Sequence, residues 1–437
     1  MKFFDRENEI ARLRAIRDKS REVARFTVVT GRRRVGKTQL LKRAFEDGEY
    51  LYFYVARKTE KDLCSGFSQQ VLDVLGLPLQ IDRFEILFKA LVELSKKRPL
   101  TIVIDEFQEL YRVNDSIFSA MADIWDDGMK EAKLNLVVCG SVNRLMTKIF
   151  KDSSEPLYGR STGLMHIDPF RVSVLKDILS TYSPRFKPDD LLALWTLTGG
   201  VARYVELLMD EKCLNRKTMI GFVFSADSPF FDEGMSILVQ EFGKEYGTYF
   251  SILSSIASGH TEYSQIKNDV GAEVGSFLSK LETDYGLVKR KIPLLAAPRQ
   301  KQASYEIDDC FFRFWFRFIW KNAYLKELQR FDVLRDIAAR DFDMFSGYAL
   351  ERYFHWKFLE EARYTKMESW WDRKGENEID LVCEDQTRNR LDFYEIKRDS
   401  SRIDLNVLKT KSDVFFAKHP ELRSREVAHI GLSLEDM

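Results

Sequence analysis

The sequence predicts an α/β protein of several domains, and three observations lead to this fold class. Three apolar runs, at 26–29, 100–104 and 134–139, alternate with helical patterns, as in a parallel sheet covered by helices. Each run ends in polar or small residues, and two short strands with charged residues are predicted near the C-terminus. The 437 residues are also too many for a single core, given roughly 100 to 200 residues per domain.

The composition excludes some classes of protein. Hydrophobic residues make up 45% of the chain, which is enough apolar material for a core in each domain. Basic and acidic residues balance at 68 each, so net charge gives no ground for polyanion binding by the whole molecule. The five cysteines are far apart, which favours neither a disulfide framework nor a zinc cluster. We find no signal-peptide core and no membrane-spanning run, and therefore expect a cytoplasmic protein.

A phosphate-binding loop is predicted between the first strand and the helix after it. The loop reads Gly31-x-x-x-x-Gly36-Lys37-Thr38, and it lies between an apolar run and a helical pattern. Glycines let backbone N–H groups approach phosphate oxygens, and the helix N-terminus adds its positive dipole end. We expect Lys37 to reach the terminal phosphates of a nucleotide, Thr38 to ligate Mg²⁺ and Gln39 to complete the cofactor-binding set.

Acidic residues after the second strand are predicted to complete this site. Asp105 and Glu106 follow the apolar run 100–104, which is typical of a buried parallel strand. We expect Asp105 to hold Mg²⁺ through water, and Glu106 to orient or deprotonate the water that attacks the γ-phosphate. Ser141, after the third strand, is predicted to sense the γ-phosphate, although a plain loop serine remains the alternative.

Several stretches resemble the archaeal-type ATPases, in the STAND branch of AAA+ proteins. They include FDRENEIARL, GRRRVGKT, VIDEFQEL, PLYGRSTG, TGGVARYVELL and YEIDDCFFRFWFRFI, so the resemblance covers nearly the whole chain. It implies a P-loop AAA+ ATPase core with ATP and Mg²⁺ as cofactors. The implied domains are the ATPase core at 1–172, a helical lid at 173–235, a winged helix with an aromatic connecting helix at 236–325, and a restriction-endonuclease-like domain at 326–437.

The same resemblance assigns a role to Arg160. The resemblance makes Arg160 a candidate for a cation near the γ-phosphate, although an isolated arginine is more often a surface residue. The resemblance also implies that Gly199-Gly200 opens a helix beside the nucleotide. Ala202 stands where the family usually has proline, so the nucleotide contacts of this segment stay open.

The predicted winged helix carries mixed charge. Three helices are expected, the third at 273–283, followed by two strands around 293–298. Outward positions of the third helix include Glu273, Lys280 and Glu282, which do not form a basic recognition surface. Positive charge comes from the wing, at Lys289, Arg290, Lys291, Arg299 and Lys301. DNA binding through this wing and a structural or self-associating role both stay open.

The C-terminal domain is predicted to carry an acid–lysine site of the restriction-nuclease kind. Glu351 lies on an amphipathic helix, Asp380 on a short strand, and Glu395 and Lys397 on the partner strand. With a period of two, Glu395 and Lys397 share one strand face. The expected roles are metal binding by the three carboxylates and charge stabilisation by Lys397, with Mg²⁺, or alternatively Mn²⁺, as the ion.

Two functions stay open on the sequence. The first is a Mg²⁺-dependent ATPase whose nucleotide state repositions a nuclease-like domain acting on DNA. The second is a nucleotide-gated regulatory module whose C-terminal site binds DNA or protein without cleavage. In the first, the expected catalytic residues are Lys37, Glu106, Arg160, Asp380, Glu395 and Lys397.

Overall fold

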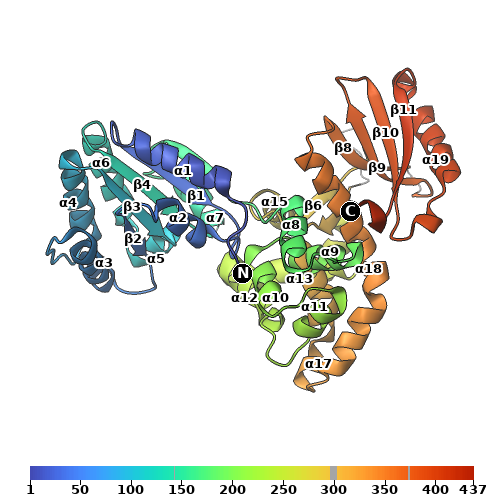
Figure 1. Cartoon of the computed structure of the whole chain (residues 1–437), viewed down its shortest axis with the longest axis horizontal. Helices are drawn as coiled ribbons and strands as arrows, with labels where there is room; N and C mark the ends of the chain where they lie inside the picture. The colour runs from blue at the N-terminus through green and yellow to red at the C-terminus, as the bar shows by residue number, and fades with distance from the viewer. Residues whose placement is uncertain (142, 296–302, 373–374) are drawn as a thin grey trace. The chain divides into compact units, whose positions relative to one another are not determined.

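The computed structural model describes residues 1–141, 143–295, 303–372 and 375–437. They divide into two units, one of residues 4–169 and the other of residues 1–3 and 170–437 (Figure 1). Each unit contains its own sheet. In the segments that the structure describes, no helix combines the length and the apolar character needed to cross a bilayer.

A five-stranded parallel sheet lies at the centre of the first unit. Its strands run in the order β2-β3-β4-β1-β5, and every neighbouring pair is parallel. The strands are β1 (Arg25–Thr30), β2 (Leu51–Tyr54), β3 (Leu100–Asp105), β4 (Leu134–Cys139) and β5 (Gly163–His166). The predicted α/β fold with a parallel sheet is confirmed, and β4 lies between β1 and β3, so the carboxyl ends of these three strands meet at one edge.

Helices cover both faces of this sheet. One face packs against α3 (Glu60–Leu75), α4 (Phe84–Lys97), α6 (Ser116–Gly128) and α7 (Asn143–Lys151), and the other against α1 (Glu7–Lys19) and α2 (Lys37–Phe45). Successive residues of one strand enter different cores, since Ile102 and Ile104 lie on the first side and Val103 on the second. This burial on both faces explains why the run 100–104 is apolar without alternation.

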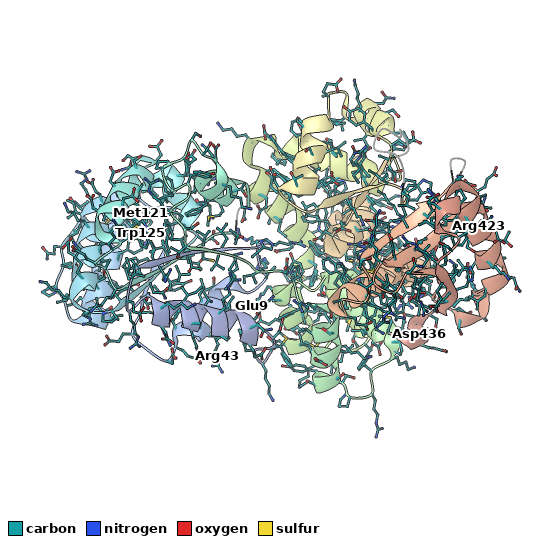
Figure 2. The ribbon with its side chains drawn as sticks, turned by 90° about the horizontal axis from the view of Figure 1, so that it is seen from above. Glu9, Arg43, Met121, Trp125, Arg423 and Asp436 are labelled. Atoms are coloured by element: carbon teal, nitrogen blue, oxygen red, sulfur yellow. The ribbon has the colours of Figure 1, made fainter. Side chains whose placement is uncertain are left out.

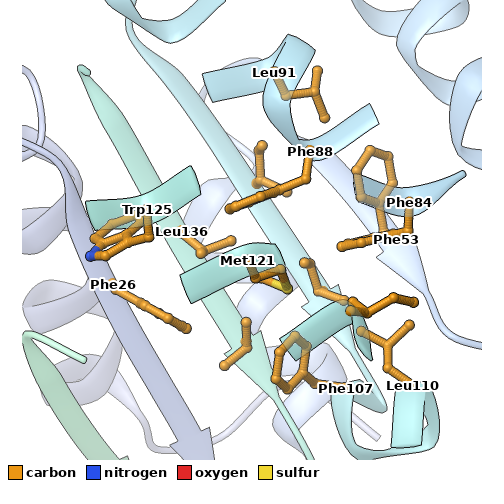
Figure 3. Packing of buried hydrophobic residues seen from close by; sticks show 14 of the residues in the cluster. Phe26, Phe53, Phe84, Phe88, Leu91, Phe107, Leu110, Met121, Trp125 and Leu136 are labelled. Atoms are coloured by element: carbon orange, nitrogen blue, oxygen red, sulfur yellow. The ribbon is translucent and has the colours of Figure 1, made fainter. Parts of the chain in front are cut away.

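Large side chains fill the core on the α3–α4–α6 side (Figure 3). Phe53 stacks on Phe67 with ring centroids 4.5 Å apart, and Phe26 contacts Trp125 at 5.2 Å. Trp125 and Met121 come from α6 (Figure 2) and are almost fully buried. Because Phe26 lies on β1, this packing holds the strand that leads into the phosphate-binding loop.

The second unit begins with helices gathered around α9 (Pro188–Thr198). Every residue from 190 to 198 is buried, as expected for a central helix that is apolar on all sides. The Trp195 indole N–H donates to the backbone carbonyl of Ala349 at 3.1 Å. The surrounding helices are α8 (Val172–Tyr182), α10 (Ala202–Asp210), α11 (Arg216–Val223), α16 (Cys310–Phe314) and the long α18 (Phe331–Glu360).

Helices and a β-hairpin form the middle of the second unit. They are α12 (Phe230–Phe242), α13 (Tyr246–Ala257), α14 (Tyr263–Val270), α15 (Gly275–Thr283), β6 (Val288–Lys291) and β7 (Ser304–Ile307). The two strands are antiparallel and flank the range 293–298 in which they were predicted. Pro293 explains the difference, because proline has no N–H to extend the ladder of β6. Arg299 and Lys301 lie outside the described residues.

A four-stranded mixed sheet completes the second unit. Its order is β11-β10-β9-β8, with β8 (Lys366–Trp371), β9 (Glu378–Asp385), β10 (Arg390–Ile396) and β11 (Glu426–Leu432). Phe393 of β10 contacts Phe415 of α19 (Leu405–Lys418), with ring centroids 5.3 Å apart. Tyr394 faces the other way and contacts Phe358 of α18 at 5.1 Å. β10 is therefore a central strand that is buried on both faces.

Candidate nucleotide site and candidate acid–lysine site

The loop between β1 and α2 has the backbone geometry that close approach to phosphate requires. Gly31 and Gly36 have φ values of 151° and 94°, which glycine adopts more readily than other residues. A Cβ on Gly31 would also lie 2.4 Å from the carbonyl oxygen of Ile167. Gly31 is thus required both by its backbone angle and by a close contact.

The Lys37 ammonium folds back over its own loop. Its Nζ donates to the carbonyl oxygens of Gly31 at 2.7 Å and Arg32 at 2.8 Å. Hydrogen bonds from an ammonium to ionised phosphate oxygens are stronger than those to neutral carbonyls. Lys37 can therefore exchange these carbonyls for the phosphates of a nucleotide.

Asp105 ends β3 and accepts hydrogen bonds from three neutral donors. Thr38 Oγ1 donates to Oδ2 at 2.7 Å, the Tyr52 hydroxyl donates to the same oxygen, and the Glu106 N–H donates to Oδ1 at 2.9 Å. Burial, and after it the Asp105 carboxylate, raise the pKa of Tyr52, so its hydroxyl remains a donor. Sequence reasoning missed Tyr52, which only the pairing of β2 with β3 brings to the site.

Glu106 follows β3 in the left-handed region, with φ 54° and ψ 40°. Residues other than glycine seldom adopt these angles, and such strain gathers at functional sites. Its carboxylate accepts hydrogen bonds from Gln108 Nε2 at 2.5 Å and from Ser141 Oγ at 3.0 Å. Sequence reasoning also missed Gln108, which is fully buried. The carboxyl edge of the sheet thus brings together Lys37, Thr38, Asp105, Glu106 and Ser141.

Arg160 and Gln39 have other surroundings. The Arg160 guanidinium forms an ion pair with Asp126 of α6 at 2.6 Å and donates to the Pro156 carbonyl. A role for Arg160 at a phosphate requires these bonds to break. Gln39 lies exposed on the first turn of α2.

Asp380, Glu395 and Lys397 lie together in the C-terminal sheet. Lys397 Nζ is 3.0 Å from Asp380 Oδ2 and 3.7 Å from Glu395 Oε1. The Ile396 N–H also donates to Asp380 Oδ2 at 2.7 Å, and the Asp404 N–H donates to Glu395 Oε2 at 3.3 Å. Burial lowers the pKa of Lys397, but the surrounding carboxylates outweigh it and raise the pKa overall. Lys397 therefore stays charged beside the two acids.

Glu351 lies on α18 within electrostatic reach of this pair. Burial, and after it the Asp380 carboxylate, raise the pKa of Glu351 to about 8. Within the described ranges, no three His, Cys, Asp or Glu side chains are gathered as a metal site. The oxygen donors of Asp380 and Glu395 suit Mg²⁺ or Mn²⁺, but a cation between them has to displace the Lys397 ammonium.

The residue after Lys397 ties this site to the helices of the second unit. Arg398 Nη2 lies 2.5 Å from Asp189 Oδ1 and 3.1 Å from Asp343 Oδ1. Arg216 of α11 pairs with the same two carboxylates, at 3.0 Å and 2.6 Å. This network joins α9, α11 and α18 to the end of β10, and sequence reasoning missed it because Asp189 and Arg398 are 209 positions apart.

Two segments of the chain match known families. Residues 3–208 match an ATPase domain found predominantly in Archaea. Residues 315–410 match a family of archaeal and bacterial proteins of unknown function. The N-terminal part of the chain is therefore an ATPase domain.

Individual proteins resemble larger parts of the chain. An uncharacterized protein of Methanocaldococcus jannaschii is 27% identical over 413 residues, covering 90% of this chain and 87% of that protein. A Walker-type ATPase of Pyrococcus abyssi has a TM-score of 0.54 at 19% identity, covering 72% of this chain and 96% of the other. The Aeropyrum pernix ORC2 protein, solved with ADPNP and ADP, has a TM-score of 0.51 at 16% identity and covers 75% and 96%. At these identities the likeness to solved structures concerns the fold, which is that of Walker-type ATPases.

Proposed function

We propose that this chain binds and hydrolyses ATP with Mg²⁺ at the carboxyl edge of its first sheet. The observation that carries the proposal is the hydrogen bond from Thr38 Oγ1 to Asp105 Oδ2 at 2.7 Å, beside the Lys37 loop. Thr38 and, through water, Asp105 would hold the Mg²⁺ ion. The bound ion would supply charge neutralisation on the phosphates.

The other polar residues at the carboxyl edge of the first sheet would bind the phosphates and position the attacking water. Lys37 leaves its two loop carbonyls and binds the terminal phosphates. Glu106 orients or deprotonates the attacking water, and Gln108 and Ser141 fix the direction of its carboxylate. A carboxylate held in this way loses little entropy when the water is positioned.

Substitution of the loop lysine tests this proposal. Lys37→Ala is expected to lower ATP turnover by at least about 100-fold, because the terminal phosphates lose their cation. Phosphate release measures turnover, and circular dichroism checks the fold. Arg43→Ala, an exposed cation on the same helix, is the matched control. Unchanged turnover in Lys37→Ala would refute the role of the loop.

We further propose that residues 326–437 form a nuclease-like domain acting on DNA, preceded by a winged helix. The succession of three helices, α13 to α15, followed by the β6–β7 hairpin supports the winged helix. The approach of Asp380, Glu395 and Lys397 supports the nuclease-like site. Asp380 and Glu395 would hold a divalent ion, and Lys397 would stabilise charge on the phosphodiester.

One observation favours a second candidate function, a nucleotide-gated module that binds without cutting. Lys397 pairs with both carboxylates and so occupies the place next to them, which suits a site that stays closed to metal. Cleavage assays with Mg²⁺ or Mn²⁺ on linear, nicked and branched DNA and on RNA separate the two candidates. Cleavage that is lost in Asp380→Ala supports the nuclease, and no cleavage of any substrate favours the binding module.

A further inference from the structure

The β6–β7 hairpin is bound to the edge of the C-terminal sheet through charged pairs. Lys289 Nζ lies 3.1 Å from Glu368 Oε2 on β8. Lys291 Nζ lies 4.0 Å from Glu378 Oε1 on β9 and 3.9 Å from Glu306 Oε2 on the hairpin's own strand β7. Lys289 and Lys291 are two positions apart on one strand, so they point to the same side, about 7 Å apart. The hairpin therefore presents two cations of one strand face to two carboxylates of the sheet, one on β8 and one on β9.

A single apolar residue accompanies these pairs. Leu294, just beyond β6, is 3% exposed and packs in the core formed by Trp370, Ile379 and their neighbours. The Leu294 N–H donates to the carbonyl oxygen of Ser369 on β8 at 3.1 Å. The contacts between the hairpin and the sheet thus include one leucine, one backbone hydrogen bond, ion pairs and the Lys291 ammonium 5.7 Å from the centre of the Trp371 ring.

The layer between the hairpin and α18 is polar and incompletely bonded. Asp308, directly after β7, forms an ion pair with Arg352 of α18 at 2.6 Å. Tyr348 and His355 flank Arg352 on the same helix face, at i−4 and i+3. Within the described part of the chain, the Tyr348 hydroxyl and His355 Nδ1 are buried without a hydrogen-bond partner. Buried polar groups of this kind favour hydration, so this layer gains partners when it opens.

We infer that the β6–β7 hairpin is a releasable arm whose Lys289 and Lys291 bind either the acidic edge at Glu368 and Glu378 or the phosphates of duplex DNA. The structure holds the first of these two states. A lysine ammonium is a compact charge that pairs with carboxylate or phosphate, so the two partners compete for the same atoms. The inference rests on the proposed action of the second unit on DNA, and it names the regulation of that action.

Charge-neutral variants of the acidic edge test the competition in the full chain. The fluorescence anisotropy of a labelled DNA duplex is measured during titration with each of four proteins. These are the wild type, E368Q/E378Q, K289Q/K291Q and the quadruple variant that combines all four substitutions. E368Q/E378Q is expected to bind about fivefold tighter, with a salt slope steeper by about two, because each freed lysine releases about 0.9 counterion. K289Q/K291Q alone should bind DNA like the wild type. The quadruple variant should lose the gain in DNA affinity that E368Q/E378Q shows.

A matched control removes the effect of charge alone. Glu211 and Glu327 are exposed glutamates of the same unit, so E211Q/E327Q changes the net charge equally and leaves the arm in place. An equal gain in DNA affinity in E211Q/E327Q, or a gain in affinity that survives in the quadruple variant, would overturn the inference. So would equal binding by every variant.

Hydrogen exchange at the Leu294 amide reports whether the arm is bound or released in the absence of DNA. Because this N–H donates to Ser369, its exchange should become faster in E368Q/E378Q and remain slow in E211Q/E327Q. Unchanged exchange in E368Q/E378Q would overturn the release of the arm. If no variant, the wild type included, binds DNA while exchange becomes faster, the proposed action on DNA fails together with the inference. DNA binding that is equal in all variants would overturn the release of the arm but leave the proposed action on DNA in place.

Discussion

The two candidate sites use their lysine in opposite ways. In the first unit, Lys37 donates to backbone carbonyls, while Asp105 and Glu106 are held by hydroxyl, amide and N–H donors. In the second unit, Lys397 lies between Asp380 and Glu395 as their counter-ion. Carboxylates held by neutral donors have no counter-ion that a metal must displace, whereas carboxylates paired with an ammonium have one. On the proposed functions, the first site would accept a metal directly, and the second would first have to release Lys397.

The largest expected effect comes from removing the charge of Glu106. Glu106→Gln should lower the turnover of ATP by roughly 10²- to 10⁴-fold, the usual contribution of a general base. Binding of ATP should persist, because Lys37, Thr38 and Asp105 remain. Phosphate release and equilibrium binding of a fluorescent ATP analogue measure the two quantities.

The neighbouring Glu109 offers the control for this prediction. Glu109 is buried and Glu106 is half-buried, but the Glu109 carboxylate pairs with Arg57 at 3.2 Å. Glu109→Gln should therefore leave turnover within a few-fold of the wild type. Equal losses in the two variants would mean that Glu106 acts only through the local structure.

The two units should also differ in their sensitivity to acid. Burial, and after it the Arg352 guanidinium, lower the pKa of His355 to about 3 from its usual 6.5. At His355 the unfolded chain therefore binds more protons than the folded chain between pH 6.5 and 3, so the stability that this residue contributes falls as the pH falls through this window. From pH 7 to 5 the contribution of His355 to the free energy of unfolding should drop by about 2 kcal/mol. The drop is read as the difference between wild type and His355→Gln, because the raised pKa of Glu351 shifts the total in the opposite direction.

Calorimetry of the full chain at both pH values measures this drop. His355→Gln should remove it, because glutamine does not titrate. His260→Gln, at an exposed histidine of the same unit, should leave it in place. An acid response that is equal in wild type and His355→Gln would contradict the assignment to this buried imidazole.

Removal of the counter-ion should sharpen the contrast between the sites. Lys397→Gln is expected to increase the affinity of the second unit for Mn²⁺ by about tenfold, since a charged hydrogen bond no longer competes with the ion. Electron paramagnetic resonance of free Mn²⁺ measures the affinity. Lys409→Gln, at an exposed lysine of α19, should change nothing. Weaker binding in Lys397→Gln would show that the ammonium does not occupy the place of the metal.

The smallest expected effect is at Arg160. Its guanidinium is held by Asp126 and the Pro156 carbonyl, so Arg160→Ala should alter turnover by less than about twofold and lower stability by at most about 1 kcal/mol. Asp126→Ala should have a similar effect on stability. A loss of turnover in Arg160→Ala that is tenfold or more, with Asp126→Ala unaffected, would instead assign the arginine to the phosphates.

The parts of the molecule that the sequence predicts are those that depend on local rules. The glycines of the phosphate loop and the two-sided burial of β3 follow from neighbouring residues alone. Tyr52 and Gln108 could not be predicted, because strand pairing and tertiary packing bring them to the acids. Lys397 was placed on the strand face of Glu395, and although β10 ends at Ile396, the Lys397 Nζ lies 3.7 Å from Glu395 Oε1, as a shared face requires.

One peptide bond joins Lys397 to Arg398, and Arg398 is held by Asp189 of α9. A genetic screen for altered behaviour of the C-terminal sheet should therefore recover substitutions in α11 and in α9, whose Asp189 is 209 positions upstream of Arg398. Truncated chains that begin after α11 would keep every residue of the acid–lysine site and lose the anchor that orients it. Such fragments would be poor stand-ins for the intact protein in any assay of that sheet.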